Sequence, residues 1–246
     1  MAAALDEELA AGPRADDTRL AFLWRLLEPQ LRARRERSVE RRLRDAHFPA
    51  TKTLEGFDFS FQPTLDRDRI MELAALDFVR RGENVLFGGM SGTGKSHLAI
   101  ALGHAACAGG FATLYTTSAE MLERLHSGQA TGGLAVEVSR YTKPAVLVID
   151  EVGLDQPERE RGRDGQLMYK AIAPRYSKQR TTIVTSNIRW EDWGSYLGDD
   201  VSTVAIIDRL IHRGHLVNIE GPSWRAHEHE KLNTRPAPPA APQVGP

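Results

Sequence analysis

Residues 88–96, GGMSGTGKS, constrain the fold of this chain more than any other stretch of its sequence. The glycines, lysine and serine that set the G-x-x-x-x-G-K-S spacing of a phosphate-binding P-loop are Gly89, Gly94, Lys95 and Ser96. An apolar run at 85–87 precedes the loop and a helical pattern at 97–107 follows it, which is the context that this motif requires. Glycines allow the backbone to turn its N–H groups toward phosphate oxygens, and a helix N-terminus adds partial positive charge.

We therefore expect this loop to bind the phosphates of a nucleotide. The residues expected to form the binding loop are Gly89, Met90, Ser91, Gly92, Thr93, Gly94, Lys95, Ser96 and His97. In such a loop Lys95 would reach the β- and γ-phosphates, and the hydroxyl of Ser96 would ligate Mg²⁺. The alternative, a glycine-rich turn that happens to precede a helix, is disfavoured because the second half of a nucleotide site is also present.

That second half begins with the apolar strand pattern AVLVIDE at 145–151, which ends in two acids. Asp150 stands where a P-loop ATPase holds Mg²⁺, usually through water, so Ser96 and Asp150 are the expected metal ligands. Glu151 stands where such enzymes place the base that orients and activates the attacking water. The alternative is a pair of carboxylates that caps the next turn.

The next apolar strand pattern, TIVTSN at 182–187, ends in Asn187. A polar side chain there can reach the γ-phosphate and the attacking water, although Asn187 could also serve only as a turn former. Strand, P-loop, strand with Asp-Glu and strand with Asn is the order of an AAA+ ATPase, and such enzymes usually complete their site with arginines. The candidates are Arg209 and Arg225, which would stabilise transition-state charge, within one subunit or across two. Otherwise each is a solvated residue or a salt-bridge partner.

The rest of the chain favours an α/β fold. Short apolar strand patterns alternate with helical patterns, which indicates a parallel sheet covered on both faces. The expected strands after the first lie at 112–116, 145–150, 181–186 and 216–220. The expected helices lie at 65–80, 118–127, 134–141, 165–179, 190–197 and 201–212. The predicted fold is an AAA+ P-loop core whose parallel sheet is flanked by helices, preceded by a small N-terminal helical region.

Four segments follow from this pattern. An N-terminal helical region (1–47) precedes a linker (48–64), the ATPase domain (65–230) and a Pro/Ala-rich tail expected to be disordered (231–246). Within the first segment a helix is expected from Asp16, and Pro29 should end or kink it. The linker, with three alternating phenylalanines at 57–61, should run extended and pack on the next domain.

Cysteine content and hydrophobicity indicate the cellular compartment in which the protein is expected. The single cysteine, Cys107, allows no disulfide within the chain and is expected in the core. No apolar run approaches twenty residues and no signal peptide is recognisable, so a cytoplasmic protein without a membrane partner is expected. His227 and His229 are two residues apart, which fits no helical metal site.

Between 41 and 225 the chain resembles the IstB-like ATPases, the helper proteins of insertion-sequence transposons and relatives of the DnaC helicase loader. The segments that carry this resemblance are 41–59, 89–103, 146–153, 181–187, 190–200 and 205–225. The most specific parts are KTLEGFDF, DEVG, TSN followed by W and GDD, and DRL followed by GPSWR. The sequence departs from the family pattern in two places. The segment 156–165 is more highly charged than the corresponding loop of the family, and we interpret it as a solvated loop in preference to a DNA or partner contact. The region before residue 41 matches the family only loosely.

The resemblance implies ATP and Mg²⁺ as cofactors, ATP hydrolysis, a homo-oligomer assembled on duplex DNA that it bends, and stimulation of a partner DDE transposase. It further implies that the N-terminal helices mediate self-assembly. By matching positions, Asp150 and Glu151 would be the Walker B pair and Asn187 would be sensor 1. Arg209 would be the arginine finger, and Arg225 would be sensor 2.

Contact with DNA must come from local basic patches, because the net charge of the chain is only −1. Residues 30–47 carry seven arginines against three acids. This composition fits either a DNA-binding helix or a solvated helix with ion pairs such as Arg32–Glu36 and Glu40–Arg44. A second group of basic residues comprises Arg124, His126, Arg140 and Lys143. Either patch would touch phosphates, with salt-sensitive affinity and weak sequence preference.

Two other functions compete with a transposition helper. A DnaC-type helicase loader has the same ATPase core but acts with a helicase and single-stranded DNA. The N-terminal region here runs directly from the arginine-rich stretch into KTLEGFDF, with no recognisable helicase-binding module. A small-molecule P-loop kinase would need an acceptor pocket and usually an arginine-bearing lid, and it would lack the Asp-Glu and Asn strand ends.

Overall fold

A five-stranded sheet organises the computed structural model, which describes residues 9–10, 12, 18–154 and 164–233. The strands are β1 (Asn84–Gly89), β2 (Thr113–Thr117), β3 (Val146–Val152), β4 (Thr181–Ser186) and β5 (Gly214–Ile219). They lie in the order β2-β3-β4-β1-β5, and each neighbouring pair is parallel. The predicted fold class, a parallel sheet flanked by helices, is confirmed.

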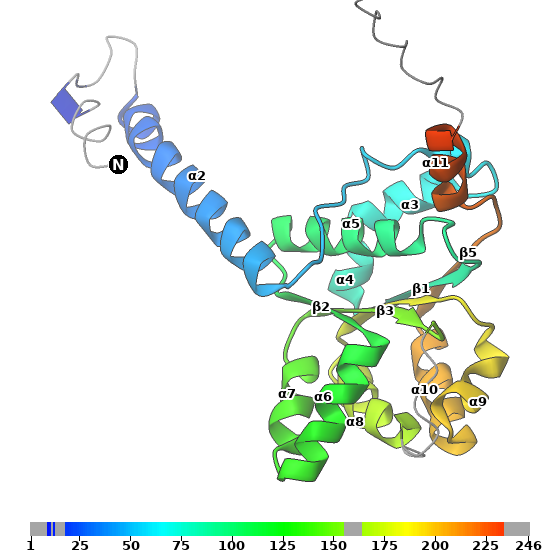
Figure 1. The fold of residues 1–246 in the computed structure, drawn as a ribbon. Helices are drawn as coiled ribbons and strands as arrows, with labels where there is room; N and C mark the ends of the chain where they lie inside the picture. The colour runs from blue at the N-terminus through cyan, green and yellow to red at the C-terminus, as the bar shows by residue number, and fades with distance from the viewer. Residues whose placement is uncertain (1–8, 11, 13–17, 155–163, 234–246) are drawn as a thin grey trace, which may run out of the picture.

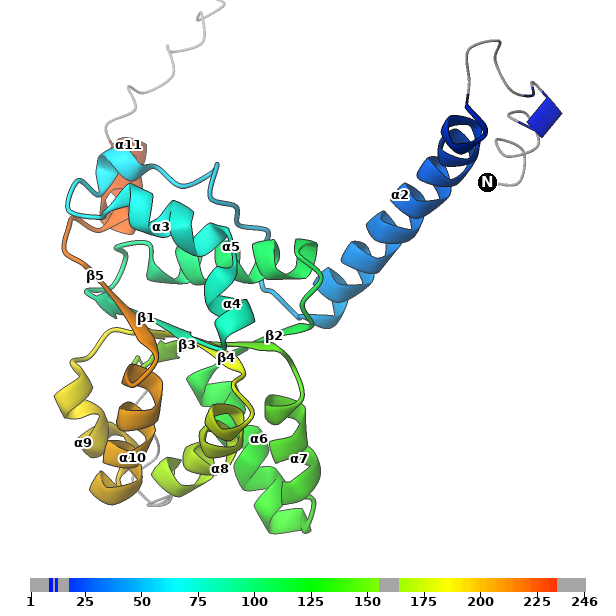
Figure 2. The same ribbon diagram turned by 180° about the vertical axis from the view of Figure 1, so that it is seen from behind.

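Helices cover both faces of this sheet (Figures 1 and 2). On one face lie α3 (Arg67–Ala74), α4 (Asp77–Arg81) and α5 (Lys95–Ala108). On the other face lie α6 (Ser118–Thr131), α7 (Leu134–Thr142), α8 (Asp164–Ser177), α9 (Trp193–Leu197) and α10 (Asp200–Ile211), with the 3₁₀ helix η3 (Trp190–Asp192) before α9. Each face therefore buries its own apolar core.

Strand β1 carries a continuous apolar run at 85–87 because alternate residues enter different cores. In β1, Val85 and Phe87 pack with Leu98 of α5, whereas Leu86 packs on the other face with Leu210 of α10. Because successive side chains of a strand point to opposite faces, a strand buried on both sides needs apolar residues at every position. The two-sided burial thus follows directly from the sequence pattern.

The N-terminal helix is expected to end or kink at Pro29. A single helix, α2 (Arg19–Asp45), runs through this residue and extends away from the sheet domain (Figure 1). Because proline has no N–H group, the carbonyl oxygen one turn earlier in the helix has no intrahelical donor. Pro29 is exposed, so water can hydrogen-bond this oxygen instead. The helix therefore does not end at Pro29, which was one of the two outcomes expected for this residue. The predicted helix start at Asp16 lies outside the described residues.

The predicted helix at 65–80 is two helices, α3 and α4, separated at Leu76. Leu76 adopts a left-handed conformation with φ of +65°. The turn allows Ile70 and Leu73 before it, and Phe78 after it, to enter the same core. One straight helix would direct some of these side chains away from the sheet, so tertiary packing overrides helix periodicity here.

The linker packs against the core as predicted. Phe48, Phe57 and Phe59 lie partly buried on the α5 face of the sheet. A short 3₁₀ helix, η1 (Phe59–Phe61), replaces part of the expected extended run. At the start of the linker, the N–H of Tyr115 in β2 donates to the carbonyl oxygen of Ala46 at 2.8 Å, which attaches the end of α2 to the edge of the sheet.

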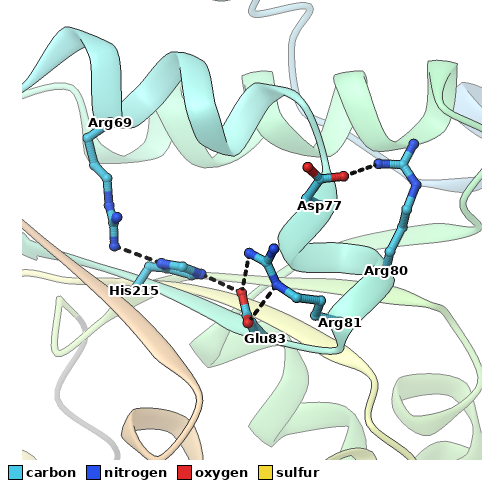
Figure 3. Close-up of polar contacts among 6 residues, drawn as sticks. All are labelled: Arg69, Asp77, Arg80, Arg81, Glu83 and His215. Atoms are coloured by element: carbon cyan, nitrogen blue, oxygen red, sulfur yellow. Dashed lines mark hydrogen bonds and ion pairs between the residues drawn. The ribbon is translucent and has the colours of Figure 1, made fainter.

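A polar cluster joins α3 and α4 to the other edge strand, β5 (Figure 3). The ring of His215 lies between Arg69 and Glu83, with 2.8 Å from Nδ1 to Arg69 Nη2 and 2.8 Å from Nε2 to Glu83 Oε2. Arg81 donates two hydrogen bonds to Glu83 and holds the pKa of that carboxyl below its usual range. Since Nδ1 accepts from Arg69, Nε2 carries the proton that is donated to Glu83.

A last helix, α11 (Trp224–Asn233), was not predicted. Cys107 is fully buried as predicted, and burial raises the pKa of its thiol. No helix in the described part of the chain is long and apolar enough to cross a membrane. α11 includes residues 231–233, which the predicted boundary assigned to the disordered tail, so the tail cannot begin before residue 234. The tail from residue 234 and most of the charged segment 156–165 lie outside the described residues.

Candidate nucleotide-binding site

The loop between β1 and α5 needs glycine for conformation and for space. Gly92 and Gly94 have φ of +82° and +98°, in the left-handed region that side chains with a Cβ rarely adopt. A Cβ on Gly92 would collide with Ser223, and a Cβ on Gly94 would lie 2.6 Å from the ring of Phe57. The loop is therefore enclosed by the linker on one side and by the segment that leads into α11 on the other.

A pocket of about 400 Å³ opens over this loop, within the size range of ligand sites. Its lining residues are Lys52, Gly56, Phe57, Asp58, Phe61, Gln62, Ser91–His97, Ile100, Glu151, Leu154, Asn187, Trp224, Arg225 and Glu228. Seven of the nine predicted loop residues thus line the pocket. The other two do not line it. Gly89 is the last residue of β1, and the exposed Met90 contributes only its carbonyl oxygen, which accepts a hydrogen bond from Lys95.

Lys95 begins α5 and is almost fully buried. Its Nζ donates to the carbonyl oxygen of Met90 at 2.6 Å. The pKa of Lys95 is lowered to about 8, mainly by burial; the charge of Asp150 opposes this shift, and the charge of Arg225 contributes to it. A desolvated ammonium group at a helix N-terminus is well suited to bind a phosphate.

Ser96 and Asp150, which are 54 residues apart in the sequence, meet beside the loop. The hydroxyl of Ser96 donates to Asp150 Oδ1 at 2.9 Å, and Asp150 is buried. Asp150 Oδ2 accepts from the hydroxyl of Tyr115 at 2.8 Å, and Oδ1 also accepts from Thr185. The carboxylate is thus held by hydroxyl groups from three different elements.

Glu151 and Asn187 both reach the pocket from the ends of neighbouring strands. The pairing of β3 with β4 shifts register between Ile149 and Val152, and Glu151 there adopts φ of +62°. The N–H of Asn187 donates to the carbonyl oxygen of Val152 at 3.2 Å, which joins the two strand ends. The parallel sheet therefore gathers both predicted polar residues at one edge.

The two candidate arginines lie in different places. Arg225 lines the pocket at the start of α11. Arg209 lies at the end of α10, with its guanidinium 5.0 Å from the ring centroid of Tyr169, and its carbonyl oxygen faces Asn84 Nδ2 at 3.4 Å. Asn84 begins β1 and the P-loop follows its end, roughly 17 Å further along the strand. Arg209 is therefore not brought to the pocket of its own chain.

The donor set fits a nucleotide with Mg²⁺. Mg²⁺ is usually held by one or two carboxylates, water and substrate phosphates, and a buried Asp150 beside the hydroxyl of Ser96 offers such ligands. An all-protein cage is not needed, and no group of three or more His, Cys, Asp or Glu residues that could hold a metal occurs in the described residues. His227 and His229 lie within the described residues and belong to no such group.

Some pocket residues were not predicted. The linker contributes Lys52, Phe57 and Phe61, and α11 contributes Trp224 and Glu228. Their place depends on contacts between distant parts of the chain, and no local pattern indicates them. Behind the pocket, Thr185 could have been noticed because it lies two residues before Asn187 on a predicted strand, whereas nothing in the sequence distinguishes Tyr115.

The two candidate basic patches also differ. On α2, Arg34, Arg35 and Arg41 are exposed, and Arg32 pairs with Glu36 at 3.2 Å as predicted. In the second patch, His126 contacts the buried carboxylate of Asp164 at the start of α8. His126 is thus engaged within the domain, which weakens its case as a phosphate contact.

Comparison with known proteins agrees with this geometry. Residues 1–232 match the family described as IstB-like ATP binding protein. The chain belongs to this family. A relative from Pseudomonas aeruginosa, named as a putative ATP-binding protein of insertion sequence IS21, is 39% identical over 85% of this chain and 78% of its own length. One from Geobacillus stearothermophilus, named likewise for insertion sequence IS5376, is 37% identical over 84% of this chain and 81% of its own length.

Solved structures support the fold of this IstB-like chain. DnaA from Aquifex aeolicus bound to AMPPCP matches 77% of the chain and 57% of its own chain, with a TM-score of 0.57 and 21% identity. The DnaC helicase loader matches 63% of the chain and 90% of its own, with a TM-score of 0.51 and 22% identity. At these identities the likeness concerns the fold, and the predicted AAA+ P-loop fold is confirmed.

Proposed function

We propose that this IstB-like protein is an ATP-dependent transposition helper. In this proposal it assembles on duplex target DNA, hydrolyses ATP and recruits a partner DDE transposase. The observation that carries the proposal is the convergence of Lys95, Glu151 and Asn187 on one pocket, with Asp150 hydrogen-bonded to Ser96 beside it. The names of its relatives, which belong to insertion sequences, support the biological setting.

The predicted residues gathered at the pocket have distinct roles in the proposed ATP hydrolysis. Lys95 and the N–H groups of the loop would hold the β- and γ-phosphates, and Ser96 and Asp150 would hold Mg²⁺. When bound, Mg²⁺ neutralises charge on the phosphate oxygens. Glu151 orients the attacking water and accepts its proton, and Asn187 directs that water toward the γ-phosphate.

Two arginines complete the proposed site. Arg225 belongs to the same chain as the pocket and acts on the bound phosphates directly. Arg209 lies about one strand length from its own P-loop, so we assign it to the pocket of a neighbouring subunit. Hydrolysis would then require the homo-oligomer.

We assign the DNA contact to α2. This helix extends from the domain (Figure 1), and several of its arginines are exposed. Its other exposed residues include Leu20, Leu23, Trp24 and Leu27, an apolar stripe at helical spacing that suits self-assembly. Basic and apolar groups on one projecting helix would couple DNA binding to oligomer formation.

Sedimentation of the purified protein tests this proposal. Samples contain a duplex of a few tens of base pairs or the matching single strand, with ATP, ADP or no nucleotide. Large assemblies that require both ATP and duplex support the proposal. Assembly on the single strand in preference to the duplex would favour a helicase loader, and a monomer that ignores both DNAs would overturn DNA-dependent assembly altogether.

The Glu151→Gln variant separates assembly from hydrolysis. Loss of the base should lower the ATPase rate by about 10²-fold or more, while ATP binding and ATP-dependent assembly on duplex persist. The Lys95→Ala variant serves as the comparison, since it should lose nucleotide binding and assembly together. An unchanged rate in Glu151→Gln would remove Glu151 from its proposed role.

A further inference from the structure

The buried carboxylate of Asp150 is hydrogen-bonded from three sides. Ser96 of α5 and Thr185 of β4 donate to Oδ1, and Tyr115 of β2 donates to Oδ2 at 2.8 Å. Tyr115 and Thr185 are both buried, and neither lines the pocket. They therefore act on Asp150 from behind, away from any bound nucleotide.

Thr185 makes a second contact that links Asp150 to Glu151. Its Oγ1 accepts a hydrogen bond from the N–H of Glu151 at 2.9 Å while its hydroxyl proton is donated to Asp150. This is the point where the β3–β4 register shifts and where Glu151 has φ of +62°, an uncommon conformation for a residue other than glycine. Such a conformation persists only where surrounding contacts hold it.

We propose that Thr185 and Tyr115 are positioning residues of the hydrolytic site. Thr185 orients Asp150 and, through the N–H of Glu151, holds the turn that directs the Glu151 side chain into the pocket. Tyr115 holds the opposite oxygen of Asp150. This inference rests on the proposed function, because it assigns the two residues to the Mg²⁺ and water-activating groups of that site.

The physical reason lies in what Ser96 must do. If the hydroxyl of Ser96 ligated Mg²⁺, its hydrogen bond to Asp150 would be weakened, and the carboxylate would then depend on its other two donors. A phenol is protonated at neutral pH, so Tyr115 remains a hydrogen-bond donor to Oδ2 of Asp150. Outer contacts of this kind orient a metal ligand without touching the metal.

The chain offers matched variants of one strand. Thr185→Val removes the hydroxyl and keeps the shape, whereas Thr185→Ser keeps the hydroxyl. Thr181→Val is the control: Thr181 is equally buried on β4, and its Oγ1 has no hydrogen-bond partner in the described part of the chain. Each protein is assayed for kcat and KM, and for binding of a fluorescent ATP analogue with Mg²⁺ and with EDTA.

We expect Thr185→Val to lower kcat by about 10- to 100-fold and to raise the Mg²⁺ concentration that half-saturates binding. Binding in EDTA should stay within about threefold of the wild type, as should every property of Thr185→Ser and Thr181→Val. Tyr115→Phe should shift the Mg²⁺ requirement in the same direction and change kcat less, because it does not contact Glu151.

Three outcomes would count against the proposal in different ways. If Thr185→Val behaved like Thr181→Val, the positioning role would be wrong. If Thr185→Ser failed as badly as Thr185→Val and binding in EDTA was lost as well, Thr185 would be a packing residue only. If the wild type bound ATP but did not hydrolyse it, the proposed function would fail, and the Mg²⁺ dependence of ATP binding would still decide whether Thr185 and Tyr115 position Asp150.

Discussion

The main-chain N–H of Trp224 donates a hydrogen bond to the carbonyl oxygen of Gly92 at 2.9 Å, so α11 begins directly on the P-loop. The linker joins the same assembly, since Gln62 Nε2 donates to the carbonyl oxygen of Pro222 at 2.9 Å. Three segments from distant parts of the chain thus enclose the pocket. One result is that Arg225 comes close enough to Lys95 to lower its pKa.

Nucleotide affinity should therefore depend on pH. The pKa of Lys95 is about 8 in the protein without nucleotide, and phosphate binding needs the charged ammonium group. As the pH rises above 8, Lys95 becomes increasingly neutral in the free protein, and it must then take up a proton when the nucleotide binds. The free energy of that protonation opposes binding, so affinity should fall about tenfold from pH 7 to 9. Isothermal titration with ATP at several pH values measures this, and a constant affinity over that range would contradict it.

The Arg225→Gln variant tests whether the charge of Arg225 contributes to the lowered pKa of Lys95. Removing the positive charge beside Lys95 should raise the pKa of Lys95 and move the loss of affinity to higher pH. Affinity at pH 7 should also fall, because Arg225 contacts the pocket, so the position of the pH transition is the quantity to compare. An identical transition in both proteins would show that Arg225 does not act on Lys95.

The Arg209→Ala variant should lose ATP hydrolysis and keep ATP binding. An arginine supplied to a neighbouring pocket stabilises the transition state, and its loss should lower the rate on the order of 10³-fold. Mixing Arg209→Ala with Glu151→Gln should restore part of the activity, because one variant keeps an intact pocket and the other supplies Arg209. The matched control is Arg213→Ala, which removes an exposed arginine from the turn that follows α10.

Duplex binding should lose salt sensitivity when α2 is neutralised. Replacing Arg34, Arg35 and Arg41 with Gln keeps helix propensity and removes three exposed charges. The slope of log affinity against log salt should become shallower by up to about 2.7, because each phosphate contact contributes about 0.9. The same replacement at Arg124 and Arg140 tests the second patch, and an effect confined to that pair would move the DNA contact from α2 to α6 and α7.

The Arg175→Met variant should be strongly destabilised. Arg175 is fully buried, and its guanidinium donates to the carbonyl oxygens of Tyr141, Pro144, Ala145 and Thr181. Methionine would leave several of these acceptors without a donor, at a cost of about 3 kcal/mol or more. Urea unfolding measures the change. The exposed Arg189 pairs with Glu191 at 3.2 Å, and Arg189→Met should change stability by less than about 1 kcal/mol.

Local sequence patterns predicted the strands and most helices because each of those elements carries its own periodicity. The buried strands could be recognised since both faces require apolar residues, and the P-loop since its glycines and lysine have few other uses at that spacing. Patterns failed at Leu76 and α11, and at Pro29 they left two outcomes open. There the outcome depends on solvent exposure or on packing against residues far away in the sequence.

The sequence by itself determined the P-loop, the strand ends that bear Asp150, Glu151 and Asn187, and the parallel α/β fold, because each depends on residues that are close together along the chain. Only the tertiary structure decided which residues share the pocket. It placed Arg225 beside Lys95, left Arg209 at the far end of β1, and brought Tyr115 and Thr185 behind Asp150. These relationships arise when separate strands pair in register, and no single segment encodes that pairing.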